Sequence, residues 1–388
     1  MFFLEKLKKL ACSLLVLMTI FQASNLVAAQ IDYKAEVPQQ TRRIRNPRIL
    51  STALCALAIV APPTSALNSQ FLHKRYNPNL EEVRILSIDG GGIKGVIPLT
   101  VLGRIETVTN QTISENFDII AGTSAGCILS TGLSAPKDPT QKVWQSYSTQ
   151  ELLTAFVNNA PTFFSKMRLR PSLYDPSTLE ILAEKFLGDT TFSQSLIPRV
   201  ATAFDETTLT TKIFSSEDED DHFAKDIALA SSAVPMIFPK RVFSPIGRTS
   251  PVHTLRDGGL LDNNPTADAI AVARRIYPKA NKFRVISLGD GRADQKNANT
   301  RLLAYADILS QLFNFEFIPY ESENNLFLSK IFGDDYVRIN PTIAKKNNNI
   351  MNGSPENIRA LIQQTNDYLD SPEGSYQFNK LLELIKKK

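Results

Sequence analysis

The sequence has few cysteines, few histidines and little net charge, and each shortage argues against a class of protein. Its 388 residues include three cysteines and three histidines. Cys127 is the single cysteine after residue 66, so the body of the chain cannot contain an intrachain disulfide. No cluster of His, Cys and Asp has the spacing of metal ligands, so we expect no metal and no cofactor. A net charge of +4 is too small to predict a nucleic-acid partner.

Long apolar runs are also missing after Ala66, which predicts that the body of the chain does not cross a membrane. Residues 1–29, in contrast, have the layout of a secretory signal peptide. Lysines at positions 6, 8 and 9 precede the apolar stretch Leu10–Ala23, and the small residues Val27 and Ala29 follow it. We therefore expect an exported or secreted protein. The alternative is a short N-terminal membrane anchor.

Residues 30–67 form a second apolar and basic segment. Four arginines precede Ile49–Ala61, whose roughly 13 apolar residues are too few to span a bilayer. Three interpretations remain open: a second targeting element, a segment that lies on a membrane surface, or the signal that is actually processed. The rest of the chain is predicted to form one domain over residues 68–345 and a C-terminal helical extension over residues 346–388.

The domain alternates strands and helices. Val83–Ile88 has the composition of a buried strand and is followed by a glycine turn and a helix to about Thr107. A second strand ends near Ala121 and precedes a helix to about Leu133, and Phe283–Leu288 is another buried strand. This repetition predicts an α/β fold with helices on both faces of the sheet.

A nucleophile elbow follows the second of these strands. Residues 122–126 have the sequence GTSAG, which fits the pattern G-x-S-x-G with Ser124 at its centre. Gly122 and Gly126 are needed because the chain folds back sharply and leaves no room for side chains. Ser124 is therefore the candidate nucleophile.

The glycine turn after the first strand complements this serine. Residues 89–95 have the sequence DGGGIKG, which offers unhindered N–H groups at a helix start, where the helix dipole favours negative charge. Such N–H groups can form an oxyanion hole, and together with the candidate nucleophile Ser124 they predict acyl transfer. The turn also fits the dinucleotide pattern G-x-G-x-x-G, but that site needs an acidic residue at the end of the next strand, and neither Glu106 nor Glu115 ends a convincing one. Asp89 would also repel a pyrophosphate.

Ser124 needs a base, because a serine hydroxyl is a poor nucleophile at neutral pH. His222 or His253 would complete a Ser-His-Asp triad, but we expect each to be a surface loop residue. Asp257, followed by two glycines, is the alternative base, on a tight turn that leaves its carboxylate accessible. The acidic run Glu217–Asp221 lacks the spacing of a calcium loop and is predicted to be exposed.

These motifs together resemble those of the patatin-like phospholipases. The resemblance covers about residues 83–345 and rests on four motifs in order: Asp89–Gly95, Gly122–Gly126, Ser231–Pro235 and Asp257–Gly259, with Asn263, Asn264 and Pro265 following. It implies a three-layer α/β/α catalytic domain with a largely parallel central sheet. It also implies a Ser–Asp dyad, in which Ser124 is the nucleophile and Asp257 accepts its proton.

The resemblance further assigns the oxyanion hole to Gly90, Gly91 and Gly92, with supporting glycines at Gly95, Gly122, Gly126, Gly258 and Gly259. The implied activity is calcium-independent hydrolysis of acyl esters of glycerophospholipids, with a phospholipid as substrate and peripheral contact with a membrane. Aromatic residues within 313–327 are candidates for an acyl groove or for core packing. Two alternatives remain: a non-catalytic lipid-binding or storage protein on the same scaffold, and a soluble-ester hydrolase with a Ser-His-Asp triad.

Overall fold

A computed structural model describes residues 76–141, 144–164, 174–293 and 318–386, the last range without the side chains of residues 318–323. The chain divides into two compact units, Met1–Ala61 and Pro62–Lys388. The predicted signal peptide and second leader segment lie outside the described residues. The predicted domain lies in the second unit.

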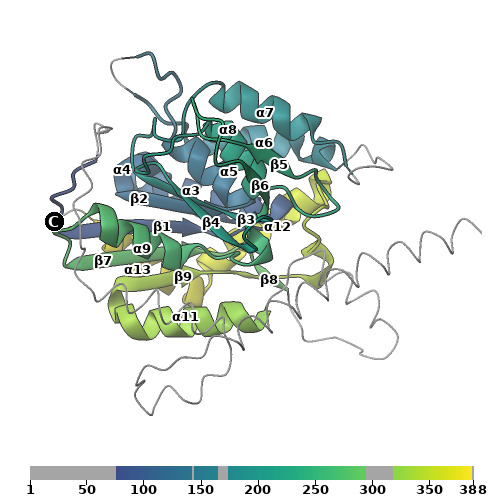
Figure 1. Cartoon of the computed structure of the whole chain (residues 1–388). Coiled ribbons are helices and arrows are strands. Elements are labelled where there is room, and N and C mark those ends of the chain that lie inside the picture. Colours follow the sequence, from purple (N-terminus) through teal and green to yellow (C-terminus); the bar gives the residue numbers. More distant parts are fainter. Residues whose placement is uncertain (1–75, 142–143, 165–173, 294–317, 387–388) are drawn as a thin grey trace, which may run out of the picture. The chain divides into compact units, whose positions relative to one another are not determined.

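A twisted sheet forms the centre of the second unit (Figure 1). Its strand order is β5-β6-β3-β2-β1-β7-β9, and β4 also pairs with β3. The neighbours β3-β2-β1-β7-β9 are parallel, whereas β4, β5 and β6 make antiparallel pairs. The strands are β1 (Glu82–Ile88), β2 (Ile119–Thr123), β3 (Arg199–Asp205), β4 (Thr210–Ser215), β5 (Arg241–Phe243), β6 (His253–Asp257), β7 (Lys282–Leu288) and β9 (Tyr336–Ile339), with β8 (Arg292–Ala293) and β10 (Thr342–Ile343) paired separately.

Helices cover both faces of this sheet (Figure 1). Leu86 and Ile88 of β1 pack in one core with residues of α3, α5 and α13, while α9 contacts β1 and β2 and α11 contacts β7 and β9. The predicted α/β fold with a largely parallel sheet is therefore confirmed. The helices are α3 (Val96–Thr109), α4 (Ile113–Asn116), α5 (Ala125–Ser134), α6 (Thr149–Phe163), α7 (Ser177–Leu187), α8 (Ala224–Ser231), α9 (Thr266–Ile276), α11 (Ile318–Phe332), α12 (Pro355–Asp370) and α13 (Pro372–Ile385). None of the helices in the described ranges is long and apolar enough to cross a bilayer.

The C-terminal residues 346–388 contain the predicted helical structure, as α12 and α13, but they do not form a separate extension. Leu381 of α13 is fully buried in the same core as β1 and β7. Arg84 and Arg284, register partners on these strands, donate hydrogen bonds to carbonyls at the end of α13, at 3.2 Å from Ile385 O and 2.9 Å from Leu384 O. Cations suit this end because the helix dipole makes it negative. The boundary predicted at residue 345 is thus not a boundary in packing.

This packing predicts that Leu381→Ala lowers the free energy of unfolding by about 2–5 kcal/mol, because the truncation leaves a cavity in the core. Urea denaturation of the full chain measures the change. Tyr376 lies on the same helix with 65% of its surface exposed, so Tyr376→Ala is the matched control and should change stability by less than about 0.5 kcal/mol. Equal effects of the two substitutions would show that α13 is peripheral.

Candidate active site

The candidate site lies where parallel strands end. The glycine turn follows the carboxyl end of β1, and Ser124 follows that of the neighbouring strand β2. Asp257 is the last residue of β6, where it pairs with Ala203 in β3. Ligand sites of parallel α/β sheets form at this edge, because the loops that leave adjacent strands meet there.

Ser124 occupies a strained turn, with φ 53° and ψ −122°. A Cβ added to Gly122 would lie 2.1 Å from Gly126 O, and one added to Gly126 would lie 2.3 Å from Ile88 O. Both glycines are therefore required by the close approach of backbone segments, as the elbow pattern predicts. Backbone strain of this kind persists where the surroundings hold it, and it is concentrated at functional sites.

Ser231, the last residue of α8, holds the backbone of this turn. Its hydroxyl accepts a hydrogen bond from Ser124 N at 2.8 Å and donates one to Thr202 O at 2.7 Å. The Ser124 amide is therefore occupied and is not a donor toward the cavity. The oxyanion donors must come from elsewhere.

The Ser124 hydroxyl donates a hydrogen bond to Asp257 Oδ2 at 2.7 Å, and Gly259 N donates to Asp257 Oδ1 at 2.7 Å. Asp257 is 2% exposed, so the prediction of an accessible carboxylate is wrong: β6 carries it into the interior. Burial raises the pKa of Asp257 to about 7, and the two hydrogen bonds partly oppose this shift. Gly258 is required beside it, because an added Cβ would lie 2.6 Å from Thr202 O.

The glycine turn contributes two candidate oxyanion donors, not the predicted three. Gly90 N donates a hydrogen bond to Asn263 O at 3.1 Å, and Asn263 Nδ2 donates to Gly90 O at 3.0 Å. This double contact uses the Gly90 amide and leaves Gly91 and Gly92, which line a cavity together with Ser124. Gly92 has φ 56°, a conformation that favours glycine.

Neighbouring side chains also leave little room at two of the other glycines. A Cβ on Gly91 would lie 2.4 Å from Asp290 Cβ, and one on Gly259 would lie 3.0 Å from Asp257 Oδ1. Gly95 is different, because an added Cβ would make an ordinary 3.4 Å contact with Ala125 Cβ. The structure therefore gives no steric reason for glycine at position 95.

The wall of the cavity beyond the polar residues is apolar and aromatic. Phe164 and Phe238 face each other with ring centroids 5.7 Å apart. The apolar lining consists of Ile93, Ala125, Ile128, Phe156, Phe163, Phe164, Leu179, Val234, Ile237, Phe238 and Ile350. The sequence did not identify these aromatics as site residues; Phe156 and Phe163, for example, lie seven residues apart in α6, which is also the spacing of ordinary core residues. The candidate groove aromatics within 313–327 mostly lie outside the described side chains.

We predicted that His222 and His253 lie in surface loops, but the two side chains are buried together. Their rings lie 6.0 Å apart and contact Phe214, and His253 Nδ1 lies 3.4 Å from Asp205 Oδ2. Burial lowers the pKa of His222. Neither histidine lines the cavity with Ser124, and His73 lies outside the described residues.

The acidic run Glu217–Asp221 is not the exposed loop that we predicted. Glu217 is buried, Asp218 pairs with Arg275 at 2.7 Å, and Asp221 accepts a hydrogen bond from Ser193 N at 3.0 Å. These contacts tie the run into the fold. Within the described ranges, no group of three or more His, Cys, Asp or Glu residues is arranged to hold a metal ion.

Residues 86–270, which contain Ser124, Asp257 and the glycine turn, match the family model described as "Patatin-like phospholipase". Residues 86–270 therefore form a patatin-like phospholipase domain. The chain is 32% identical over 253 residues to "Patatin-like protein 2" of Arabidopsis thaliana. The aligned residues cover 55% of this chain and 61% of the relative. The match thus spans a little under two thirds of the length of that relative.

Two further relatives of this patatin-like chain have names that bear on activity. "Calcium-independent phospholipase A2-gamma" of Mus musculus is 28% identical, over 68% of this chain and 35% of the relative. "Probable inactive patatin-3-Kuras 1" of Solanum tuberosum is also 28% identical, over 65% of this chain and 75% of the relative. The relatives therefore include one protein named as a phospholipase and one named as probably inactive.

The dinucleotide interpretation of the glycine turn does not suit this patatin-like domain. Glu106 lies in α3 and accepts hydrogen bonds from Ile113 N and Thr149 N at 3.2 and 2.8 Å. Glu115 belongs to the capping box of α4. Both carboxylates fix helix starts and neither ends a strand beside the turn.

The raised pKa of Asp257 predicts a pH-dependent stability difference between the parent and Asp257→Asn. An unfolded aspartate loses its proton near pH 4, whereas folded Asp257 keeps it until about pH 7. Its stabilising contribution is thus complete below pH 4 and is lost as the pH rises to 7. Because asparagine does not titrate, the variant should gain roughly 2–4 kcal/mol relative to the parent between pH 4 and pH 8. Urea denaturation across this range measures the gain; parallel stability curves would contradict it.

Proposed function

We propose that the domain hydrolyses acyl esters of lipids, with glycerophospholipids as the main substrate class. The observation that carries this proposal is the 2.7 Å hydrogen bond from Ser124 Oγ to Asp257 Oδ2, beside the glycine turn and in a cavity with an apolar wall. The match of residues 86–270 to the patatin-like phospholipase family model supports it. The apolar wall suits an acyl chain, because a hydrocarbon gains free energy when such a surface removes it from water.

In the proposed reaction, Asp257 accepts the proton of Ser124 as Oγ attacks the carbonyl carbon of the ester. The carbonyl oxygen becomes an oxyanion beside the amides of Gly91 and Gly92, which stabilise it. The bond to the alcohol breaks and Asp257 returns its proton to the leaving oxygen. Asp257 then takes a proton from water, which attacks the acyl-enzyme and releases the fatty acid, while Ser124 regains its proton. A base with a pKa near 7 suits both proton transfers at neutral pH.

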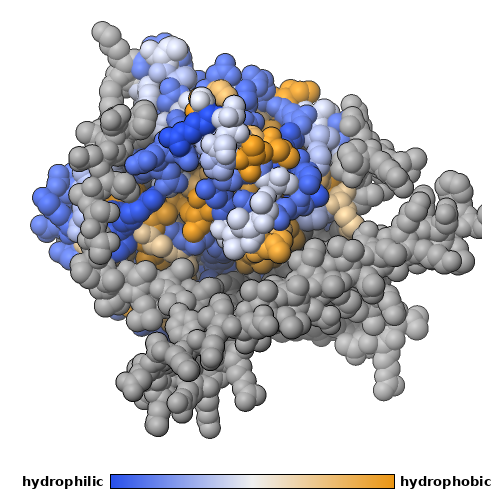
Figure 2. Space-filling model, viewed as in Figure 1, coloured by the Kyte–Doolittle hydropathy of each residue, from blue (hydrophilic) through white to orange (hydrophobic). Residues whose placement is uncertain are grey.

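We also propose that the cavity mouth contacts a lipid surface. Met236 and Leu261 are 36% and 37% exposed, and each lies one or two residues from the cavity-lining residues Ile237 and Asn263. In Figure 2 the described part of the visible face is mostly hydrophilic, with smaller hydrophobic groups between the polar ones. Partly exposed apolar side chains such as Met236 and Leu261 suit shallow and reversible insertion into a bilayer.

A second candidate is a lipid-binding or storage protein without catalysis, because one relative is named as probably inactive. A Ser-His-Asp hydrolase of soluble esters is less consistent with the site, since His222 and His253 do not line the cavity. The Ser124–Asp257 contact favours the hydrolase over both.

We predict that Ser124→Ala reduces release of fatty acid from phosphatidylcholine vesicles by at least about 1,000-fold while the protein stays folded, because it removes the nucleophile. Ser134→Ala is the matched control. Ser134 is a fully buried serine on α5 whose hydroxyl donates to Ser130 O at 2.7 Å, so its loss affects stability but not the site.

Chelation of calcium should leave the rate of fatty-acid release by the parent within about twofold, because backbone amides take the place of a cation.

The same assay on a soluble short-chain ester separates the three candidate functions. A lipid acyl hydrolase releases fatty acid from vesicles, and Ser124→Ala abolishes its activity on both the vesicles and the short-chain ester. A binding or storage protein binds vesicles without releasing fatty acid, and a soluble-ester hydrolase cleaves only the short-chain ester. Turnover of vesicles that survives Ser124→Ala within about tenfold would refute the assignment of the nucleophile.

A further inference from the structure

A buried carboxylate lies directly before the glycine turn. Asp89 is 2% exposed and precedes Gly90, and its amide donates to Leu288 O at 3.0 Å. In the proposed reaction a negative charge develops two to three residues further along the chain. An uncompensated carboxylate at this place would oppose that charge, because charges interact strongly where water is excluded.

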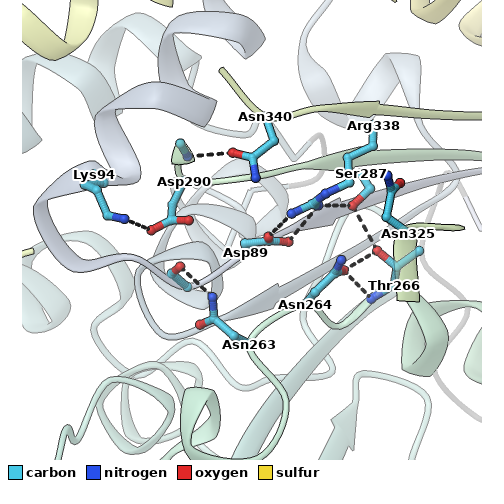
Figure 3. A network of polar contacts seen from close by, with 12 residues as sticks. Asp89, Lys94, Asn263, Asn264, Thr266, Ser287, Asp290, Asn325, Arg338 and Asn340 are labelled. Carbon is cyan, nitrogen blue, oxygen red and sulfur yellow. Dashed lines mark hydrogen bonds and ion pairs between the residues drawn. The ribbon is translucent and has the colours of Figure 1, made fainter. Parts of the chain in front are cut away.

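Arg338 of β9 neutralises Asp89 (Figure 3). Its Nη2 lies 2.5 Å from Asp89 Oδ2 and its Nη1 lies 3.3 Å from Asp89 Oδ1, so both guanidinium nitrogens meet the carboxylate. The side chains are 5% and 2% exposed. A planar fork that contacts both oxygens fixes the orientation of the carboxylate as well as its charge.

Arg338 also connects the glycine turn to the loop that follows Asp257. Its Nη1 donates to Ser287 Oγ at 2.6 Å, and Ser287 Oγ lies 3.1 Å from Thr266 Oγ1. Thr266 Oγ1 donates in turn to Asn264 Oδ1 at 2.5 Å (Figure 3). The two sides of the site are thus joined behind the cavity by one hydrogen-bonded chain.

The position of Arg338 follows from the register of the sheet. Arg338 pairs with Ser287, and Ser287 pairs with Ser87 of β1. Ser87 lies two residues before Asp89, which directly follows β1. Successive residues of a strand alternate between faces, so Ser87 and Asp89 point to the same side. Ser287 and Arg338 lie beyond residue 270, where the match to the family model ends.

We propose that Arg338 is a positioning residue for the oxyanion hole: it cancels the charge of Asp89 and holds the glycine turn against the loop of the base. The proposal rests on the hydrolase function proposed above. Arg338 acts through Asp89 and the turn and has no contact with the reacting atoms in this account.

The test compares kcat and KM of the full chain on phosphatidylcholine vesicles in three variants. Arg338→Met should lower kcat about 10- to 100-fold with KM within about threefold, because it leaves the Asp89 charge beside the oxyanion. Asp89→Asn/Arg338→Met removes both charges and should regain at least about tenfold of that loss. Arg338→Lys keeps the charge and should stay within about tenfold of the parent.

A second readout measures the oxyanion directly. A long-chain trifluoromethyl ketone adds to a serine hydroxyl and forms a tetrahedral oxyanion, so its inhibition constant should rise in Arg338→Met by about the factor lost in kcat. The control is Arg84→Met, which breaks another largely buried Arg–Asp pair, with Asp118 at 2.6 Å, near the opposite end of β1. It should lower stability and leave kcat within about threefold of the parent.

An unchanged kcat in Arg338→Met, or a double variant as slow as Arg338→Met, would overturn the proposal. If Arg338→Met does not fold, the double variant and Arg338→Lys decide the question. A loss in kcat above about 100-fold in both of these variants, when both are folded, would overturn the proposal. Failure of the proposed function has a different signature, in which the parent and Ser124→Ala give the same fatty-acid release. In that case the role of Arg338 fails with it.

Discussion

The strained backbone of Ser124 is the constraint on which the rest of the site depends. A serine at φ 53° can present its hydroxyl to Asp257 because Gly122 and Gly126 leave the turn free of side chains and Ser231 holds its amide. The strain is stabilised by contacts with three different elements, namely β1, β3 and α8. Strain of this kind persists only where the surrounding structure holds it in place.

The electrostatics of the site follow from how each buried charge is compensated. Asp89 is paired with Arg338, and Lys94, 2% exposed, is paired with Asp290 at 2.6 Å (Figure 3). Asp257 instead accepts hydrogen bonds from Ser124 and Gly259, and burial outweighs them and raises its pKa to about 7. The surroundings therefore keep two carboxylates as fixed parts of ion pairs and leave the third able to accept and return a proton.

The elbow and the parallel sheet could be predicted because both are encoded locally, in a glycine–serine pattern and in apolar strands. Asp257 was a candidate base because of its aspartate–glycine turn, and the family resemblance also assigned it this role. Its burial could not be inferred, because β6 must first pair with β3. Contacts between distant segments caused the other differences. Asn263 O accepts a hydrogen bond from the Gly90 amide across 173 residues of sequence, and aromatic rings bury His222, which we expected in a surface loop. The aromatic wall and Arg338 have no local pattern at all.

The central claim is that Ser124 is a nucleophile activated by Asp257 without a histidine. Labelling with a long-chain fluorophosphonate tests it most directly, because the activated oxygen attacks phosphorus and fluoride leaves, which marks the nucleophile. Intact-mass measurement and peptide mapping should find one adduct per chain, on Ser124, formed at a similar rate in folded His222→Gln and His253→Gln and at least about 100-fold more slowly in Asp257→Asn. An adduct on another residue, or a rate that depends on either histidine as strongly as on Asp257, would contradict the account.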